Sequence, residues 1–137
     1  MKKHESKNEV AYVSGSADES SYRFGVVMTI DDRCVAKITG QGEDPEFLAL
    51  GDGAGAIVGC LVAVEQAVSI DRCEFLTVCC GFKGVEKWAT GEWKAESVGA
   101  SEYFNRLMKL AKKIDISFTE ETSHMEYMRE AEKLAGN

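Results

Sequence analysis

Residues 54–80 read AGAIVGCLVAVEQAVSIDRCEFLTVCC, and this stretch decides which fold the chain can adopt. Its first part, residues 54–70, is apolar almost all round a helix, which at this length predicts a buried helix rather than a strand. Its last part, residues 74–80, is a continuous apolar run, which is typical of a central parallel strand. A helix that leads into such a strand predicts an α/β fold with helical crossovers.

Upstream of this stretch, three shorter segments predict an antiparallel meander. Residues 10–14 and 22–30 are mostly apolar, and residues 34–39 alternate between two faces, as strands do. A polar turn at residues 15–21 separates the first two segments. Residues 40–53, which contain glycines and acids, are expected to form a loop before the long helix.

Downstream, the pattern alternates between helices and one more strand. We expect a short helix at residues 83–90 and a longer helix that begins at the N-cap Ser101. A short strand at residues 115–118 precedes a last helix, which opens with a capping box of Ser123 and Glu126. The predicted order is βββαβααβα. It gives a mixed five-stranded sheet, with three antiparallel and then two parallel strands, and helices on both faces.

The composition fits one domain. The chain has 137 residues, a hydrophobic content of 45% and a net charge of −7. Residues 1–8 are charged and are expected to form a mobile tail before a single domain at residues 9–137. An acidic chain does not resemble a general nucleic-acid binder, because attraction to phosphate comes from clustered Lys and Arg.

Cysteine usage and the N-terminus suggest where the protein works. The five cysteines are odd in number and form no C-x-x-C pair, which argues against a disulfide framework or a zinc site. Most of them stand among Val, Leu and Ile, so we expect buried structural thiols and a reducing, cytoplasmic location. We expect no signal peptide and no membrane span, since no apolar run approaches the roughly 20 residues that a span requires.

Five segments, in order across nearly the whole chain, resemble the ribonuclease HI family. The most specific is residues 84–94, GVEKWATGEWK, which resembles GIEKWATGEWK in a bacterial branch of the family. Residues 11–16, AYVSGS, resemble the first-strand motif AYVDGS, and residues 22–27 resemble the second strand. Residues 54–67 resemble the first long helix, AGExxGxxxAVExA, and residues 131–135, AEKLA, resemble the last-helix motif ADKLA. The chain is therefore identified as resembling ribonuclease HI.

The resemblance implies two-metal hydrolysis of a nucleic acid, but this chain lacks most of the acids that hold the metal ions. Members of the family hydrolyse the RNA strand of an RNA–DNA hybrid with two Mg²⁺ or Mn²⁺ ions, which three or four carboxylates hold. Here Ser14, Ala56 and Gly81 replace three of those acids, and Glu132 replaces the aspartate of the last helix. One carboxylate cannot hold two dications close together. We therefore expect a degenerate member that is not an enzyme, binds no metal cofactor and does not cleave hybrids.

Other acids could in principle form a relocated metal site. Asp52 lies four residues before the altered helix position, and Glu120 and Glu121 follow the last strand. With Glu132 they could restore a metal-dependent nuclease, although acids in such loops are usually just solvated. The family's mobile-loop histidine would fall at Thr122, and His124 is out of register with it.

Basic and aromatic residues suggest a binding surface. Residues 83–113 carry a local excess of positive charge, and Arg106, Lys109 and Lys113 are expected on one helical face. In the family, the segment matched by Trp93 and Lys94 lies along the DNA strand of the hybrid. An amphipathic surface helix would show the same lysine stripe without binding anything. Trp88 fits a core position better than a ligand contact.

Three functions remain open at this stage. The first is a protein-interaction, inhibitory or scaffold module, with a protein partner or self-association. The alternative is a non-cleaving protein that binds RNA or an RNA–DNA hybrid through the candidates Trp93, Lys94, Arg106, Lys109 and Lys113. The least favoured is a nuclease with relocated carboxylates.

Overall fold

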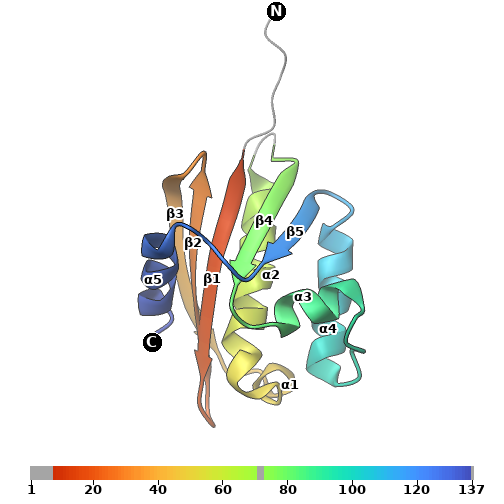
Figure 1. Cartoon of the computed structure of the whole chain (residues 1–137). Helices are drawn as coiled ribbons and strands as arrows, with labels where there is room; N and C mark the ends of the chain where they lie inside the picture. Colours follow the sequence, from red (N-terminus) through yellow and green to blue (C-terminus); the bar gives the residue numbers. More distant parts are fainter. Residues whose placement is uncertain (1–7, 71–72, 137) are drawn as a thin grey trace, which may run out of the picture.

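The computed structural model describes residues 8–70 and 73–136 and contains one mixed five-stranded sheet (Figure 1). Strands β1 (Glu9–Ala17), β2 (Tyr22–Ile30) and β3 (Arg33–Gly42) form the antiparallel meander. Strand β4 (Phe75–Cys80) is parallel to β1, and β5 (Asp115–Thr119) is parallel to β4. The strand order across the sheet is β3-β2-β1-β4-β5. The predicted sheet of three antiparallel and two parallel strands is thus confirmed.

Helices cover both faces of the sheet, as expected. Helix α2 (Ala54–Ser69) packs on the face that carries Val13 and Val26, together with α3 (Gly84–Thr90) and α4 (Val98–Leu110). Helix α5 (Met125–Leu134) packs on the opposite face, against Tyr12 and Val27. The larger of the two cores lies between α2 and the sheet.

The stretch at residues 51–69 is apolar because it forms the centre of the fold. By length and composition Gly51–Ser69 could cross a membrane, so the apolar stretch is longer than the sequence reading allowed. Most of it is buried inside the fold, which is how the core helix of a globular domain also looks.

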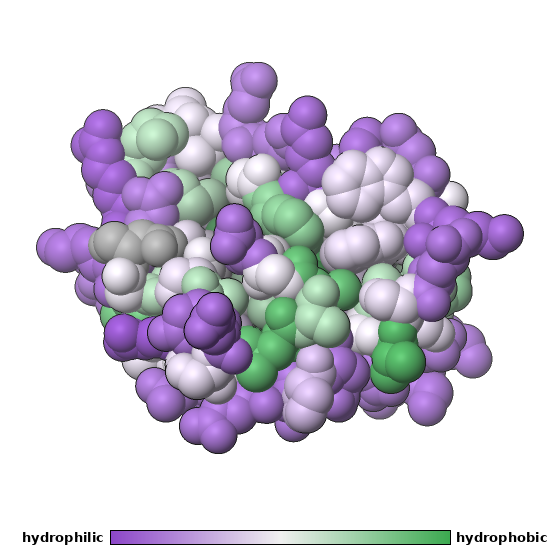
Figure 2. Space-filling view, turned by 90° about the horizontal axis from the view of Figure 1, so that it is seen from below, coloured by the Kyte–Doolittle hydropathy of each residue, from purple (hydrophilic) through white to green (hydrophobic). Residues whose placement is uncertain are grey.

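Two short helices fill the segment that was predicted to be a loop. Helix α1 (Pro45–Leu48) begins with a proline in its first turn, where the missing N–H costs nothing, and it buries Phe47. A 3-10 turn, η1 (Gly51–Gly53), leads directly into α2. Seen from below, this end of the molecule gathers apolar side chains at its centre, with hydrophilic ones around them (Figure 2).

Several predicted boundaries were wrong. Strand β1 continues to Ala17, because the turn is shorter than expected: the Asp18 carboxylate accepts hydrogen bonds from the backbone N–H groups of Ser20 and Ser21 at 2.8 and 2.9 Å. Helix α4 begins one turn before Ser101, at the N-cap Ser97, whose hydroxyl oxygen accepts a hydrogen bond from the N–H of Ala100 at 3.1 Å.

The capping box at the last helix is absent as well. His124 is the N-cap of α5, and no side chain caps the helix there. One cysteine also departs from the expected burial: Cys34 is exposed, beside an irregularity in the β2–β3 pairing between Met28 and Thr29. The predicted mobile tail lies almost entirely outside the described residues.

Candidate functional site

A cavity of about 610 Å³ opens where β1, β4, the start of α2 and the start of α5 meet. All four positions that the sequence analysis singled out line it: Ser14, Ala56, Gly81 and Glu132. They come from β1, α2, α5 and the residue after β4, so only the folded chain brings them together. The resemblance therefore identified one real place in the structure.

Strand register sets the positions of Ser14 and Gly81. Val13 of β1 pairs with Cys80 of β4, so the next residue on each chain, Ser14 and Gly81, lies at the same level. A Cβ atom on Gly81 would meet nothing within 4 Å, so this position faces open space. A Cβ atom at residue 81 would therefore fit without moving its neighbours.

Close backbone packing places Ala56 and Glu132 beside Ser14 and Gly81. Gly15 lies so near the backbone of Ala56 that no Cβ would fit between β1 and α2. Ser14 pairs with Gly25 of β2, and Gly25 in turn lies against the carbonyl of Ala131, the residue before Glu132. Ala56 is buried at 4% exposure, whereas Glu132 is exposed.

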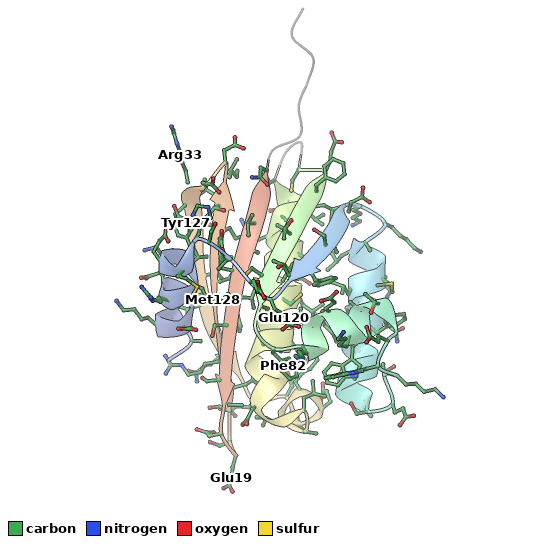
Figure 3. The ribbon with its side chains drawn as sticks, viewed as in Figure 1. Glu19, Arg33, Phe82, Glu120, Tyr127 and Met128 are labelled. Carbon is green, nitrogen blue, oxygen red and sulfur yellow. The ribbon has the colours of Figure 1, made fainter. Side chains whose placement is uncertain are left out.

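The cavity is acidic. Asp52, Glu120 and Glu121 line it together with Glu132, and among the described residues that line it none is Lys or Arg. In Figure 3, Glu120 lies between Phe82 and Met128, which line the same cavity. The structure thus brings together all four acids that could form a relocated metal site.

These acids do not form a metal centre in the structure. Within residues 8–70 and 73–136, no three His, Cys, Asp or Glu side chains are grouped closely enough to hold one ion. Two dications would need several anionic oxygens converging on one point. The residues present therefore do not fit the pair of Mg²⁺ or Mn²⁺ ions that the ribonuclease HI resemblance implies.

His124 lies outside the cavity lining and contacts two acids. Its Nε2 lies 3.3 Å from a carboxylate oxygen of Asp32 and its Nδ1 lies 3.7 Å from that of Glu126. Thr122, the position that the resemblance assigns to the histidine of the family's mobile loop, lines the cavity and hydrogen-bonds the Tyr12 side chain. His124 is therefore tied to the β2–β3 turn and is not part of the lining.

The vicinal thiols do not supply a nucleophile. Cys79 belongs to the core under α5 and Cys80 to the core under α2, so their side chains point to opposite faces, as successive residues of a strand do. Burial raises the pKa of Cys80, which lines the cavity, to about 11. The thiol stays protonated near neutral pH, and the thiolate is the reactive form.

An aromatic row leads from the cavity to the surface, and sequence reasoning missed its first member. The Phe82 ring packs edge-on against Trp88 at 6.0 Å, and Trp88 packs in the same way against Trp93 at 5.6 Å. Phe82 fills the space left by the missing side chains of Gly53 and Gly84. Trp88 is half-buried against the core, and Trp93 is 40% exposed. In the sequence, only Gly53 and Gly84 could have indicated that a ring packs at this place.

The basic candidates do not all lie on one helix. Helix α4 ends at Leu110, so the prediction that Lys113 shares a helical face with Arg106 and Lys109 was wrong. Lys94 lies before the start of α4 and Lys113 after its end, and a 13-residue helix is about 20 Å long. Arg106 is 3.4 Å from Glu65 and 4.0 Å from Glu102, which offsets its charge.

Solved structures show which fold this is. The N-terminal RNase H domain of a Mycobacterium tuberculosis protein superimposes with a TM-score of 0.73 at 15% identity, over 96% of this chain and 95% of that one. RNase H1 from Halobacterium salinarum gives 0.74 at 19% identity, over 94% and 95%. The protein has an RNase H-like fold. LC11-RNase H1, solved in complex with an RNA/DNA hybrid, gives 0.73 at 14% identity, over 93% of each chain.

At these identities the comparisons show the RNase H-like fold and no more. No protein-family model matches the sequence, and no curated protein matches it. The function therefore has to be argued from the cavity and the surface of this chain.

Proposed function

We propose that this protein is a non-cleaving RNase H-fold protein that works as an interaction module, an inhibitor or a scaffold, for a protein partner. The observation that carries the proposal is the cavity: Ser14, Ala56, Gly81 and Glu132 line it and supply a single carboxylate. Hybrid cleavage by the family's route needs two dications among several anionic ligands. A hydroxyl, a methyl group and a hydrogen atom cannot offset that charge.

The electrostatics of the cavity favour a protein over a nucleic acid. Four carboxylates line it, from Asp52, Glu120, Glu121 and Glu132, and the whole chain carries a net charge of −7. Such a field repels phosphate and attracts cations. A partner segment that carries Lys or Arg would meet complementary charge there, at a place the fold leaves open.

The first experiment asks whether the chain cleaves a hybrid and whether restoring the four acids produces cleavage. The wild-type chain and a restored variant, Ser14→Asp, Ala56→Glu, Gly81→Asp and Glu132→Asp, are incubated with an RNA–DNA hybrid and Mg²⁺ or Mn²⁺. The restored variant should cleave the hybrid and the wild type should not. A control with three acids added at exposed positions away from the cavity, Gln41→Glu, Gln66→Glu and Asn105→Asp, should stay inactive. Cleavage by the wild type would refute the proposal.

The second experiment tests the cavity as a docking place. Wild-type protein and a Glu120→Gln, Glu121→Gln, Glu132→Gln variant serve as baits for binding partners and for a fluorescent Lys/Arg-rich peptide. Binding should be lost in this variant and kept in a control that neutralises three exposed acids elsewhere, Glu19, Glu43 and Glu96. Equal binding by the cavity variant and the control variant would mean that the cavity is not the docking place.

A second candidate function is nucleic-acid binding without cleavage. One observation favours it: Trp93 is 40% exposed and stands beside the exposed Lys94, and such a pair can stack on a base and neutralise a phosphate. It predicts hybrid binding that weakens with salt and with Lys94→Gln, Lys109→Gln and Lys113→Gln together. Anisotropy of a labelled hybrid measures this, and binding unaffected by the triple change counts against it.

A further inference from the structure

Phe82 stands between two surfaces of different chemistry. On one side it lines the acidic cavity. On the other side it begins the aromatic row of Phe82, Trp88 and Trp93, whose ring centroids are 6.0 and 5.6 Å apart. Trp93 therefore lies at most about 12 Å from Phe82, which is the length of about eight residues of an α-helix. A short bound segment can contact both the cavity and the exposed end of the row.

The cavity combines acids with an apolar wall. Its apolar lining includes Phe82 and the buried residues Val13 and Met128, whereas its carboxylates belong to four exposed residues, Asp52, Glu120, Glu121 and Glu132. In Figure 3, Phe82 and Met128 lie on either side of Glu120. Lys and Arg side chains have the matching composition, because an apolar stem carries a charged end group. The cavity, at about 610 Å³, is large enough to admit such a side chain.

The aromatic row is electrically balanced. Residues 83–96 contain three Lys and three Glu, and Lys87 pairs with Glu92 at 3.0 Å. The positive charge of residues 83–113 thus comes from the part that follows residue 96. A phosphate chain laid along the row would meet no net positive charge there and four carboxylates at the cavity. An apolar side chain suits the row better, since Trp93 is 40% exposed and tryptophan is common at the centre of protein interfaces.

We propose that the cavity and the aromatic row form one docking surface for a basic amphipathic helix of a partner protein. A Lys or Arg of that helix enters the cavity, where its stem packs on Phe82 and Met128 and its charged end meets the carboxylates. An apolar residue about two turns further along the same helical face covers Trp93. This inference rests on the proposed function, because it takes the cavity as a docking place, and it adds the partner's second contact.

Tryptophan fluorescence of the full chain reports docking directly, because Trp88 and Trp93 are its two tryptophans. The probe is a Trp-free Leu/Lys peptide of about five helical turns, with its leucines at helical spacing. Binding should shift the emission to the blue, since the exposed Trp93 ring leaves water. Trp93→Phe should lose most of the shift. An unshifted spectrum at saturating peptide would overturn the proposal.

Trp93→Ala tests the contact with the row. It should weaken binding of the labelled Leu/Lys peptide, measured by anisotropy, at least about tenfold, and Trp93→Phe should restore most of the binding because a ring remains. Val35→Ala shortens another exposed apolar side chain, on β3, and as the control it should have little effect. A peptide with serines in place of the leucines should bind more weakly and be indifferent to Trp93→Ala.

The contact with the cavity is tested separately, so that a failure of this inference differs from a failure of the proposed function. Glu120→Gln together with Glu121→Gln should weaken binding of both peptides. Glu19→Gln together with Glu43→Gln, at exposed acids elsewhere, should weaken neither. Weaker binding with the cavity change but not with Trp93→Ala would overturn this inference and leave the cavity as a docking place. Binding that ignores the cavity change would overturn both.

Lys94→Gln distinguishes a basic helix from a nucleic acid on the same row. The change removes a positive charge beside Trp93, so it should raise the affinity for the Leu/Lys peptide about twofold. It should weaken the binding of a labelled RNA–DNA hybrid, which would lose a phosphate contact. Weaker peptide binding by this variant, or a hybrid that binds more tightly than the peptide and depends on Trp93, would overturn the proposal.

Discussion

Gly25 of β2 lies against Ala131 of α5 so closely that a Cβ atom on Gly25 would fall on the carbonyl oxygen of Ala131. The same atom would stand 2.6 Å from Cβ of Leu134. Two hydrogen bonds fasten the end of α5 to the same sheet: the Ser16 hydroxyl donates to the carbonyl of Ala135 at 2.7 Å, and the Thr39 hydroxyl donates to that of Leu134 at 2.8 Å. This contact holds Glu132 over the cavity.

We predict that Gly25→Ala destabilises the fold strongly. The new methyl group must displace the backbone of α5, and overpacking of a tight core commonly costs about 1–3 kcal/mol. Gly81→Ala is the matched control, because its Cβ would meet nothing within 4 Å, and it should change the free energy of unfolding by less than about 0.5 kcal/mol. Urea unfolding followed by circular dichroism measures both. Equal stability of the two variants would show that α5 is not packed as the structure has it.

The sequence predicted the parts of the fold that depend on periodicity or on long apolar runs. The helix at residues 54–69 and the strand at residues 75–80 are recognisable because most of their side chains are apolar and more than half of them are buried. Helix α1 was missed because four residues show no period, and its single buried side chain, Phe47, looks isolated in the sequence. The start of α4 was misplaced because Val98, its first residue, is 74% exposed and gives no apolar signal.

The same distinction applies to the site. Motif likeness located Ser14, Ala56 and Glu132, because each lies inside a segment that resembles the family, and Gly81 was placed by its position directly after the predicted fourth strand. The sequence could not show that the basic candidates do not share one helix, because this depends on where α4 ends. It also could not show that Glu65 offsets the charge of Arg106, because the two residues meet only in the folded chain. Phe82 was missed because its position depends on two glycines, one of them about 30 residues away in the chain.

We predict that Ser97→Ala costs about 1 kcal/mol of stability, the usual effect of losing an N-cap. The Ser97 hydroxyl oxygen accepts the N–H of Ala100, which otherwise lacks a partner within the helix. Ser101→Ala is the control, because Ser101 lies inside α4, where alanine is the better helix former. It should be neutral or slightly stabilising. Thermal unfolding of the two variants decides between Ser97 and Ser101 as the cap.

We predict one fast thiol per native chain. Cys34 is exposed, whereas the other four cysteines are buried. Burial raises the pKa of Cys60 to about 12 and that of Cys80 to about 11, which keeps both in the unreactive thiol form. A chromogenic disulfide reagent at pH 8 should therefore label one equivalent quickly and all five only in denaturant. Cys34→Ser should remove the fast phase, and two or more fast thiols would contradict the burial of the cores.

We predict that the fold loses stability as the pH rises from about 10 to 12. Burial, together with the hydrogen bond that the Tyr22 hydroxyl donates to Asp44 at 2.8 Å, raises the pKa of Tyr22 to about 12 from 10.0. Burial also raises the pKa of Tyr103, whose hydroxyl donates to the carbonyl of Val85 at 2.6 Å. In this window the unfolded chain has lost phenolic protons that the folded chain keeps, so the free energy of unfolding falls with pH.

The variant Tyr22→Phe separates the contribution of Tyr22 from the rest. Below pH 10 it should be less stable than the wild type by about 1 kcal/mol, the net worth of one hydrogen bond. Between pH 10 and 12 its stability should fall less steeply, because one of the retained protons is gone. Urea unfolding at half-unit steps from pH 8 to 11.5 gives both slopes. Parallel curves for the two proteins would mean that Tyr22 does not keep its proton through the pH range where the free phenol ionises.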